Sequence, residues 1–146
     1  MKIMINEMKL RLLAKGESEK LSRAMVTAAA YQFNPTVEEL LDFCIAVSEA
    51  VTNCVVHAYV NLMPWEKGYI YITVRLYNNR EISVEIRDTG VGIEDIERAK
   101  EPLYTTGDGE RCGLGFVVME SCCDSLTVKS TVGRGTKVIL RKKFTP

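Results

Sequence analysis

Five stretches of the chain alternate apolar and polar residues, which is the pattern of a strand that buries one face. They are residues 8–12, 69–76, 82–87, 126–130 and 137–142. Asn78-Asn79 predicts a tight hairpin turn between the second and third stretches, and Gly133-Arg134-Gly135 predicts a turn between the last two. Because each stretch has a single apolar face, the predicted strands need to be covered on one side only.

Four other stretches predict helices, over residues 18–33, 36–60, 94–100 and 113–123. Ser18 is a candidate cap for the first helix, which Asn34-Pro35 ends. The apolar side of this helix would carry Leu21, Met25, Ala28 and Ala29. Thr36 and Glu39 form a capping box that opens the second helix, because a hydroxyl and a carboxylate three residues apart satisfy each other's backbone N–H groups.

The order of these elements predicts an α+β fold with two layers. Strands and helices follow one another as strand, two helices, two strands, two helices, two strands. We expect a two-layer α/β sandwich in which a mostly antiparallel, mixed sheet has helices on one face. Residues 1–146 contain no repeat, low-complexity stretch or linker, so we expect a single domain.

Composition narrows the function classes. The chain has 146 residues, 47% of them hydrophobic, and 19 basic residues balance 19 acidic ones. A protein that binds nucleic acid through bulk charge would have a basic excess, so we expect no direct nucleic-acid binding and, for any phosphate ligand, a local site. The sequence has no uninterrupted apolar membrane span and its charged N-terminus lacks a signal-peptide core, so we expect a cytoplasmic protein.

Cysteine and histidine usage agrees with a reducing compartment. The five cysteines form no Cys-x-x-Cys pair, and we interpret them as reduced structural thiols. A single histidine, His57, excludes a histidine-rich metal site.

A narrow polar stripe interrupts the apolar helix over residues 36–60. Ser48, Glu49, Thr52 and Asn53 occupy positions i, i+1, i+4 and i+5, and His57 extends the stripe by one turn. Burial of an unpaired carboxylate costs several kcal/mol, on the order of 3–5, so the stripe must face solvent, another chain or a ligand cavity. The alternative to a ligand site is the solvent-exposed side of an amphipathic helix.

Two glycine-bearing segments are candidates for a ligand site. Asp88-Thr89-Gly90-Val91-Gly92 follows a strand directly, and its carboxylate could accept a hydrogen bond from an amino group, although Asp-x-Gly is also an ordinary turn. Residues 105–115 combine threonines, Arg111 and glycines ahead of a helix, which suits an anion site or a surface loop. Neither a P-loop nor a Rossmann motif is present.

Taken in order, these motifs resemble the GHKL ATPase superfamily, which includes DNA gyrase and histidine kinases. Ser48-Glu49-Ala50-Val51-Thr52-Asn53, with His57-Ala58-Tyr59 after it, is similar to the anti-sigma factor serine kinases of that superfamily. Glu101-Pro102-Leu103-Tyr104-Thr105-Thr106 and Gly133-Arg134-Gly135-Thr136 agree with the same family. The resemblance covers nearly the whole chain.

The resemblance implies a role for each matching residue, with ATP or ADP and Mg²⁺ as cofactors. Glu49 matches the general base, Asn53 the Mg²⁺ ligand, and Asp88 the carboxylate that reads the adenine amino group. Arg23 matches an arginine that contacts the protein partner. The remaining nucleotide-binding positions are Gly90, Gly92 and Thr136 at the adenine pocket and Thr105, Thr106, Arg111, Gly113, Leu114 and Gly115 around the phosphates.

The resemblance also implies partners. Members of the family pair as homodimers, hold a sigma factor and phosphorylate a serine on an anti-anti-sigma factor. This chain lacks the lysine often found after the two lid threonines, and Ala58 stands where a glycine is frequent. The sequence leaves open a role in sporulation or in general stress, an anti-sigma module that uses ATP only structurally, and a fragment of a larger ATPase.

Overall fold

Five strands form one sheet in the computed structural model, which describes residues 1–101 and 114–146. The strands are β1 (Met4–Leu13), β2 (Tyr69–Tyr77), β3 (Glu81–Asp88), β4 (Ser125–Thr131) and β5 (Gly135–Lys143). Their order across the sheet is β1-β2-β3-β5-β4, and all four pairings are antiparallel. The five predicted strands are therefore confirmed, while the parallel pairing that a mixed sheet requires does not occur among the described residues.

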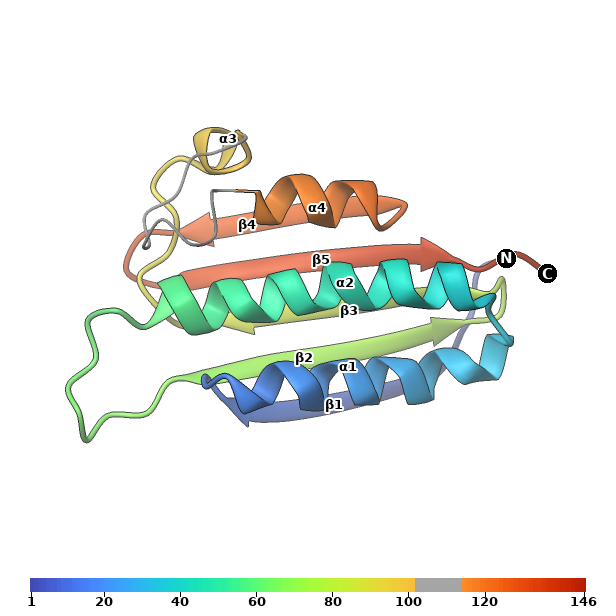
Figure 1. Ribbon diagram of the computed structural model, residues 1–146, viewed down its shortest axis with the longest axis horizontal. Coiled ribbons are helices and arrows are strands. Elements are labelled where there is room, and N and C mark those ends of the chain that lie inside the picture. Colours follow the sequence, from blue (N-terminus) through green and yellow to red (C-terminus); the bar gives the residue numbers. More distant parts are fainter. Residues whose placement is uncertain (102–113) are drawn as a thin grey trace.

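All helices lie on one face of this sheet, as predicted (Figure 1). They are α1 (Glu17–Ala30), α2 (Val37–Asn53), α3 (Ile96–Ala99) and α4 (Gly115–Ser121). A 3-10 turn, Tyr31–Phe33, extends α1, and a π-helical turn, Cys54–Ala58, extends α2. The other face of the sheet is left open, which gives the two-layer α+β architecture.

The core lies between α2 and the central strands. Alternate residues of β2 expose at most 1% of their surface to solvent: Ile70, Ile72, Val74 and Leu76. Phe43, Val47 and Val51 of α2 are fully buried against the same layer. The helical stretch Val37–Ala58 is long and apolar enough to cross a membrane by length and composition alone. Some of its apolar side chains are buried by this packing, whereas Val37, Leu41 and Ile45 stay exposed.

The first helix differs from the prediction in its cap and its buried face. Gly16, not Ser18, is the N-cap residue, and no side chain caps α1. Ser18 is buried inside the helix, where its hydroxyl donates to the Leu13 carbonyl. Leu21 is exposed, as is Ala28. The buried face is instead made by Ser18, Ser22, Val26, Ala29 and Ala30. These residues are small, so α1 can approach the sheet and α2 closely.

The predicted hairpin turn between β2 and β3 is confirmed, since residues 78–80 join the two paired strands. Arg80, with φ of 70°, is the left-handed residue of this turn. The Arg80 guanidinium donates to the carbonyl oxygens of Phe33, Phe144 and Thr145. These tertiary hydrogen bonds offset the cost of a positive φ outside glycine, which is about 1–2 kcal/mol.

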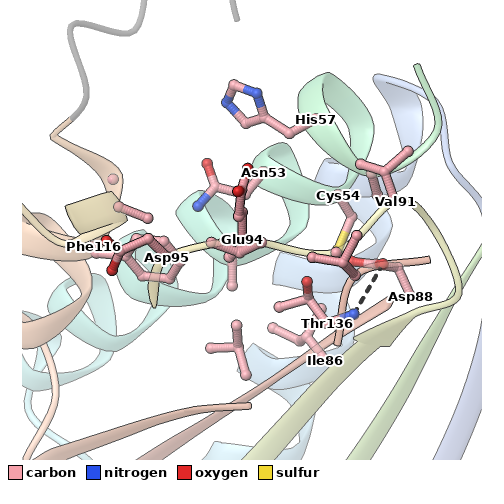
Figure 2. Close-up of a pocket in the computed structure, with 18 of the residues that line it drawn as sticks. Asn53, Cys54, His57, Ile86, Asp88, Val91, Glu94, Asp95, Phe116 and Thr136 are labelled. Atoms are coloured by element: carbon pink, nitrogen blue, oxygen red, sulfur yellow. Dashed lines mark hydrogen bonds between the residues drawn. The ribbon is translucent and has the colours of Figure 1, made fainter. Parts of the chain in front are cut away.

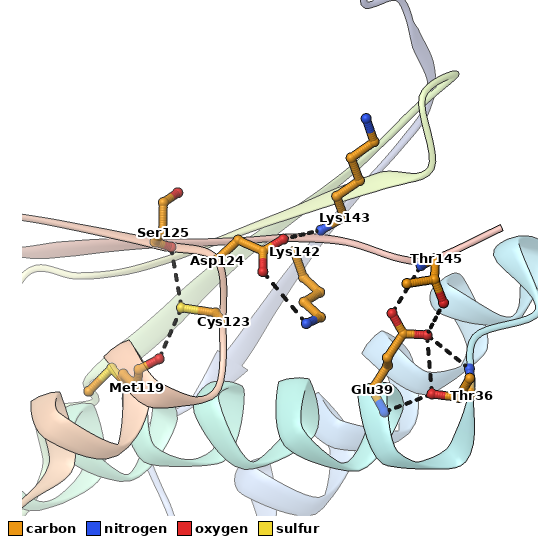
Figure 3. A network of polar contacts seen from close by, with 9 residues as sticks. All are labelled: Thr36, Glu39, Met119, Cys123, Asp124, Ser125, Lys142, Lys143 and Thr145. Atoms are coloured by element: carbon orange, nitrogen blue, oxygen red, sulfur yellow. Dashed lines mark hydrogen bonds and ion pairs between the residues drawn. The ribbon is translucent and has the colours of Figure 1, made fainter.

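The predicted capping box is confirmed and extends further than the local sequence indicates. The Glu39 backbone N–H donates to Thr36 Oγ1 at 3.1 Å, and the Glu39 carboxylate accepts from the Thr36 N–H at 3.2 Å. The same carboxylate accepts from the Thr145 N–H at 2.9 Å, which fastens the C-terminal tail to the start of α2 (Figure 3). The backbone hydrogen bond from Thr145 lowers the pKa of Glu39.

The four described cysteines are free thiols, as the sequence predicts. Cys123 lies two residues after the end of α4, and its thiol lies 2.9 Å from the Met119 carbonyl and 3.3 Å from the Ser125 carbonyl (Figure 3). Burial raises the pKa of this thiol to about 11. It therefore stays protonated and donates at the junction of α4 and β4.

Candidate active site

A cleft of about 740 Å³ opens between the end of α2, the end of β3, α3 and the turn that joins β4 to β5. This volume is within the range of about 300–1,000 Å³ that small-molecule sites occupy. Residues from five separate segments line it (Figure 2). Those with polar side chains are Asn53, Cys54, His57, Asp88, Glu94, Asp95, Arg98 and Thr136.

The polar stripe of α2 divides into two rows. Ser48 donates to Glu19 Oε1 of α1 at 2.6 Å, and Thr52 donates back to the Ser48 carbonyl at 2.7 Å. That row faces α1 and its own helix. The second row consists of Glu49, Asn53 and His57, spaced one turn apart, and two of its members, Asn53 and His57, line the cleft.

Glu49 borders the cleft at the start of α4 without lining it. A Cβ built on Gly115 would lie 3.4 Å from Glu49 Oε2 and 3.3 Å from both polar atoms of the Asn53 amide. The Glu49 carboxylate and the Asn53 amide therefore both lie next to the backbone of Gly115. Gly115 itself lines the cleft, so the structure brings Glu49, Asn53 and Gly115 together beside the cavity that also holds Asp88.

Asp88 is the most buried carboxylate of the cleft, with 6% of its surface exposed. Its Oδ1 accepts from the backbone N–H groups of Gly90 at 3.0 Å and Thr136 at 3.2 Å. Its Oδ2 lies 3.4 Å from the Cys54 thiol. Burial of an acidic group requires such donors, because an unpaired one would cost several kcal/mol, on the order of 3–5.

Backbone hydrogen bonds hold the glycine turn after β3 from two sides. The Val91 N–H donates to the Ala58 carbonyl at 2.8 Å, and the Val91 carbonyl accepts from the Gly133 N–H at 2.9 Å. A Cβ on Gly90 would lie 2.0 Å from the Ala58 carbonyl oxygen. Gly92, at φ of 77°, leaves similarly little room, since its Cβ would lie 2.4 Å from the Thr131 carbonyl oxygen. Both glycines are thus required by close backbone approach.

Two further residues hold the cleft wall, and no sequence pattern marked them as site residues. The Tyr59 hydroxyl accepts from the Thr89 N–H at 2.9 Å and donates to the Tyr69 carbonyl. Ser130 Oγ accepts from the Ile93 N–H at 2.7 Å and shares a hydrogen bond of 2.8 Å with the Thr136 hydroxyl. The Thr136 side chain therefore lines the cleft with its hydroxyl held by β4.

A group of predicted phosphate-site residues lies outside the described residues: Thr105, Thr106, Arg111 and Gly113. Leu114 is the N-cap residue of α4, and Gly115 is its first residue. The predicted helix over 113–123 is thus observed from Gly115 to Ser121.

Asn53 is the described residue best suited to hold a metal ion in the cleft. No group of three His, Cys, Asp or Glu side chains in the described ranges could hold a metal by itself. The Asn53 amide lines the cleft and makes no hydrogen bond to another described residue, so its oxygen is available. Mg²⁺ fits this donor set, because it keeps several waters and needs only one or two protein oxygens beside substrate phosphates.

Arg23 lies away from the cleft, on the exposed side of α1. Its Nε is 2.7 Å from Glu19 Oε1, the same carboxylate that Ser48 contacts. Arg23 lines a second hollow between α1 and α2, together with Ala24, Ala28, Tyr31 and Leu41. Tyr31 and Leu41 are large apolar side chains that stay exposed there. We call these residues, with Arg23, the α1–α2 surface.

Comparison with known sequences shows the family of the chain. The family described as histidine kinase-like ATPase domain matches residues 13–142. The chain is 47% identical over 140 residues to an anti-sigma F factor of Clostridium acetobutylicum, covering 95% of this chain and 94% of the relative. It is 45% identical over 142 residues to an anti-sigma F factor of Clostridium perfringens, covering 97% and 99% of the two chains.

Solved structures share the fold at low sequence identity. The RsbU and RsbW domains of a Mycobacterium tuberculosis protein match 97% of this chain with a TM-score of 0.67 and 16% identity, and this chain spans 33% of that structure's chain. A blue-light activated histidine kinase of Erythrobacter litoralis matches 74% of this chain, over 46% of its own, with a TM-score of 0.57 and 24% identity.

Proposed function

The chain belongs to the anti-sigma F factor family of histidine kinase-like ATPase domains, and we propose that it is an anti-sigma factor and an ATP-dependent protein serine kinase. The observation that carries this proposal is the shared cleft of Asp88, Asn53 and Gly115, with Glu49 beside it. A base-reading carboxylate, a metal-ligand amide and a general base are the parts that phosphoryl transfer from ATP requires.

In this proposal the adenine of ATP binds at Asp88. A carboxylate held by two backbone N–H groups is a fixed acceptor, and an adenine amino group is a matching donor. Gly90, Gly92 and Thr136 shape the wall of the adenine pocket. The cleft volume of about 740 Å³ is large enough for a purine nucleotide.

The phosphates extend from the adenine pocket toward the start of α4. Asn53 would hold Mg²⁺, which supplies neutralising charge to the phosphates when bound. Thr105, Thr106, Arg111, Gly113, Leu114 and Gly115 are the proposed phosphate contacts. Gly115 lies close to the Asn53 amide, since a Cβ built on Gly115 would be 3.3 Å from both of its polar atoms. This proximity supports phosphates that run from Asp88 toward the start of α4.

Glu49 is the proposed general base. Its carboxylate lies one helical turn from Asn53 and faces Gly115, so it sits at the phosphate end and not at the adenine end. From there it orients the hydroxyl of a partner serine and accepts its proton. A protein that used ATP only as a structural ligand would have little need of a carboxylate at this point.

We propose a sigma factor and an anti-anti-sigma factor as the protein partners, with Arg23 in the contact. Two observations support the α1–α2 surface for this role: Arg23 is exposed, and apolar side chains gather around it. Exposed apolar patches of this kind mark protein interaction sites. We further propose a single cytoplasmic domain that acts as a homodimer and regulates transcription in sporulation.

The decisive experiment measures phosphate transfer from radiolabelled ATP to a candidate anti-anti-sigma factor. Glu49→Gln removes the base and keeps the shape, so we expect ATP binding within about threefold of wild type and transfer reduced at least about 100-fold. Glu38→Gln, on the exposed start of α2, is the control and should transfer at the wild-type rate.

Two outcomes would argue against the assignment. Unchanged transfer by Glu49→Gln would reject Glu49 as the base. ATP binding without transfer by wild-type protein, with the sigma factor still held, would favour the alternative of an anti-sigma module with a structural nucleotide.

A further inference from the structure

Cys54 contacts the carboxylate that lies deepest in the cleft. It stands at the first position of the π-helical turn, is 6% exposed, and lines the cleft. Its sulfur is 3.4 Å from Asp88 Oδ2, a distance at which a thiol donates a hydrogen bond (Figure 2). The hydrogen bond links two segments 34 residues apart in sequence, α2 and the end of β3.

The two oxygens of Asp88 have different environments. Oδ1 accepts two backbone N–H groups, from Gly90 and Thr136, and these occupy its favourable directions. Oδ2 accepts only the weak Cys54 donor among the described residues. A carboxylate oxygen can accept about two hydrogen bonds, so Oδ2 keeps one direction for a ligand donor.

The chemistry of the two groups fixes the direction of this hydrogen bond. A carboxylate oxygen can only accept, so at 3.4 Å the Cys54 thiol is the donor and Asp88 Oδ2 is the acceptor.

We propose that Cys54 is a positioning residue for nucleotide recognition, whose thiol orients Asp88 so that Oδ2 presents one open acceptor direction to the purine 6-amino group. This inference rests on the proposed ATP site. It goes beyond that site because it assigns selectivity for the amino group to a cysteine that touches the carboxylate and not the base.

The alternative is that Cys54 only fills space, as small apolar residues do. Cys44 provides the comparison, because it is also a buried cysteine of the same helical run, but its sulfur lies 3.3 Å from Thr27 Oγ1 on the side facing α1. A space-filling role predicts that removal of either thiol affects stability alone. A positioning role predicts that only Cys54 affects the choice of base.

The test compares ATP with purine riboside triphosphate, which lacks the 6-amino group, by calorimetric titration of the full chain. The ratio of the two dissociation constants measures recognition of the amino group independently of the phosphates. We expect Cys54→Ala to reduce this ratio about three- to tenfold, the effect of one weakened hydrogen bond. Cys54→Ser restores a donor and should stay within about twofold of wild type. Cys44→Ala is the matched control and should leave the ratio unchanged.

A second readout needs no nucleotide. The infrared S–H stretch of Cys54 should be shifted to lower frequency than that of an exposed thiol, and this component should disappear in Cys54→Ala. Asp88→Asn should shift the same component, because the strong carboxylate acceptor is gone.

The outcomes separate the inference from the function on which it rests. If wild-type protein binds neither nucleotide, the ATP site and this inference fall together. If it binds ATP with selectivity and Cys54→Ala keeps the full ratio, only the positioning role is overturned. An S–H band that ignores Asp88→Asn contradicts the inference as well.

Discussion

The missing Cβ of Gly90 allows the turn after β3 to pack directly against the end of the α2 helical stretch. The turn that carries Asp88 approaches the end of α2 so closely that only hydrogen fits between Gly90 and the Ala58 carbonyl. The same contact aligns the Val91 N–H with that carbonyl at 2.8 Å. The position of Asp88 in the cleft therefore depends on backbone packing two residues away.

We expect Gly90→Ala to destabilise the fold by about 2–3 kcal/mol or to displace the turn, because the new methyl group overlaps backbone that cannot rotate away. Gly16→Ala is the matched control, since nothing lies within 4 Å of its built Cβ and neither glycine has a positive φ. Urea denaturation measures both. Equal stabilities of the two variants would contradict the close contact.

At the scale of elements, the junction of α2 with the C-terminal tail rests on Glu39. The carboxylate completes the capping box and accepts the Thr145 N–H (Figure 3). Hydrogen bonds to its charged form, with the one from Thr145 foremost, lower its pKa below the ordinary value of 4.5. The stabilisation is thus present above pH 4.5 and is lost as pH falls through the lower folded-state pKa.

Glu39→Gln should accordingly lower stability by about 0.5–1 kcal/mol at pH 7, in the range of a lost cap at an exposed site. The difference from wild type should shrink as the pH falls through the folded-state pKa of Glu39, which lies below 4.5, because wild-type Glu39 then becomes protonated too. Thermal unfolding across pH 3–7 measures this. A difference that stays constant over the whole range would exclude a role for the carboxylate charge.

The elements that sequence predicted well are those fixed by burial or by local hydrogen bonds. In β2 and β3, apolar and polar residues alternate because one side of each strand faces the core. The Thr36–Glu39 capping box requires only hydrogen bonds between residues that are close in sequence. The predicted cap of α1 was wrong because the Ser18 hydroxyl donates to the Leu13 carbonyl instead. The left-handed position at Arg80 had no local signal, because its hydrogen bonds to Phe33 and Phe144 form only in the folded chain. The π-helical turn had no sequence signal at all.

The same division applies to the candidate site. The residues Glu49, Asn53, Asp88 and Gly115 could be named from motifs, and the structure brings the last three to one cleft with Glu49 beside it. The partners of Asp88 could not, because Cys54 and Thr136 reach it only after the sheet and α2 have packed. Helical spacing also placed Ser48 and Thr52 in the predicted polar stripe. In the structure their hydroxyls do not face the cleft: Ser48 donates to Glu19 of α1, and Thr52 donates to the backbone carbonyl of Ser48.

At the scale of the whole molecule, the cleft at Asp88 and the α1–α2 surface share no lining residue. Arg23→Ala should therefore weaken partner binding about tenfold while ADP affinity stays within about twofold of wild type. Lys9→Ala, an exposed cation on β1, is the control and should leave both affinities unchanged. Titration of each variant with sigma factor and with ADP measures the two effects. Loss of ADP binding in Arg23→Ala would show that the two regions are not independent.

Both chain ends are fastened beside the turn that joins β2 to β3. Asn78 accepts from the Ile3 N–H at 2.8 Å and donates to the Met1 carbonyl, while Arg80 donates to Phe144 and Thr145. The two termini consequently lie near each other in Figure 1. A short peptide could join them, and new ends could be opened in the exposed connection at residues 61–67. Such a circular permutant would keep every strand neighbour and give reporter domains a new attachment point on an exposed connection.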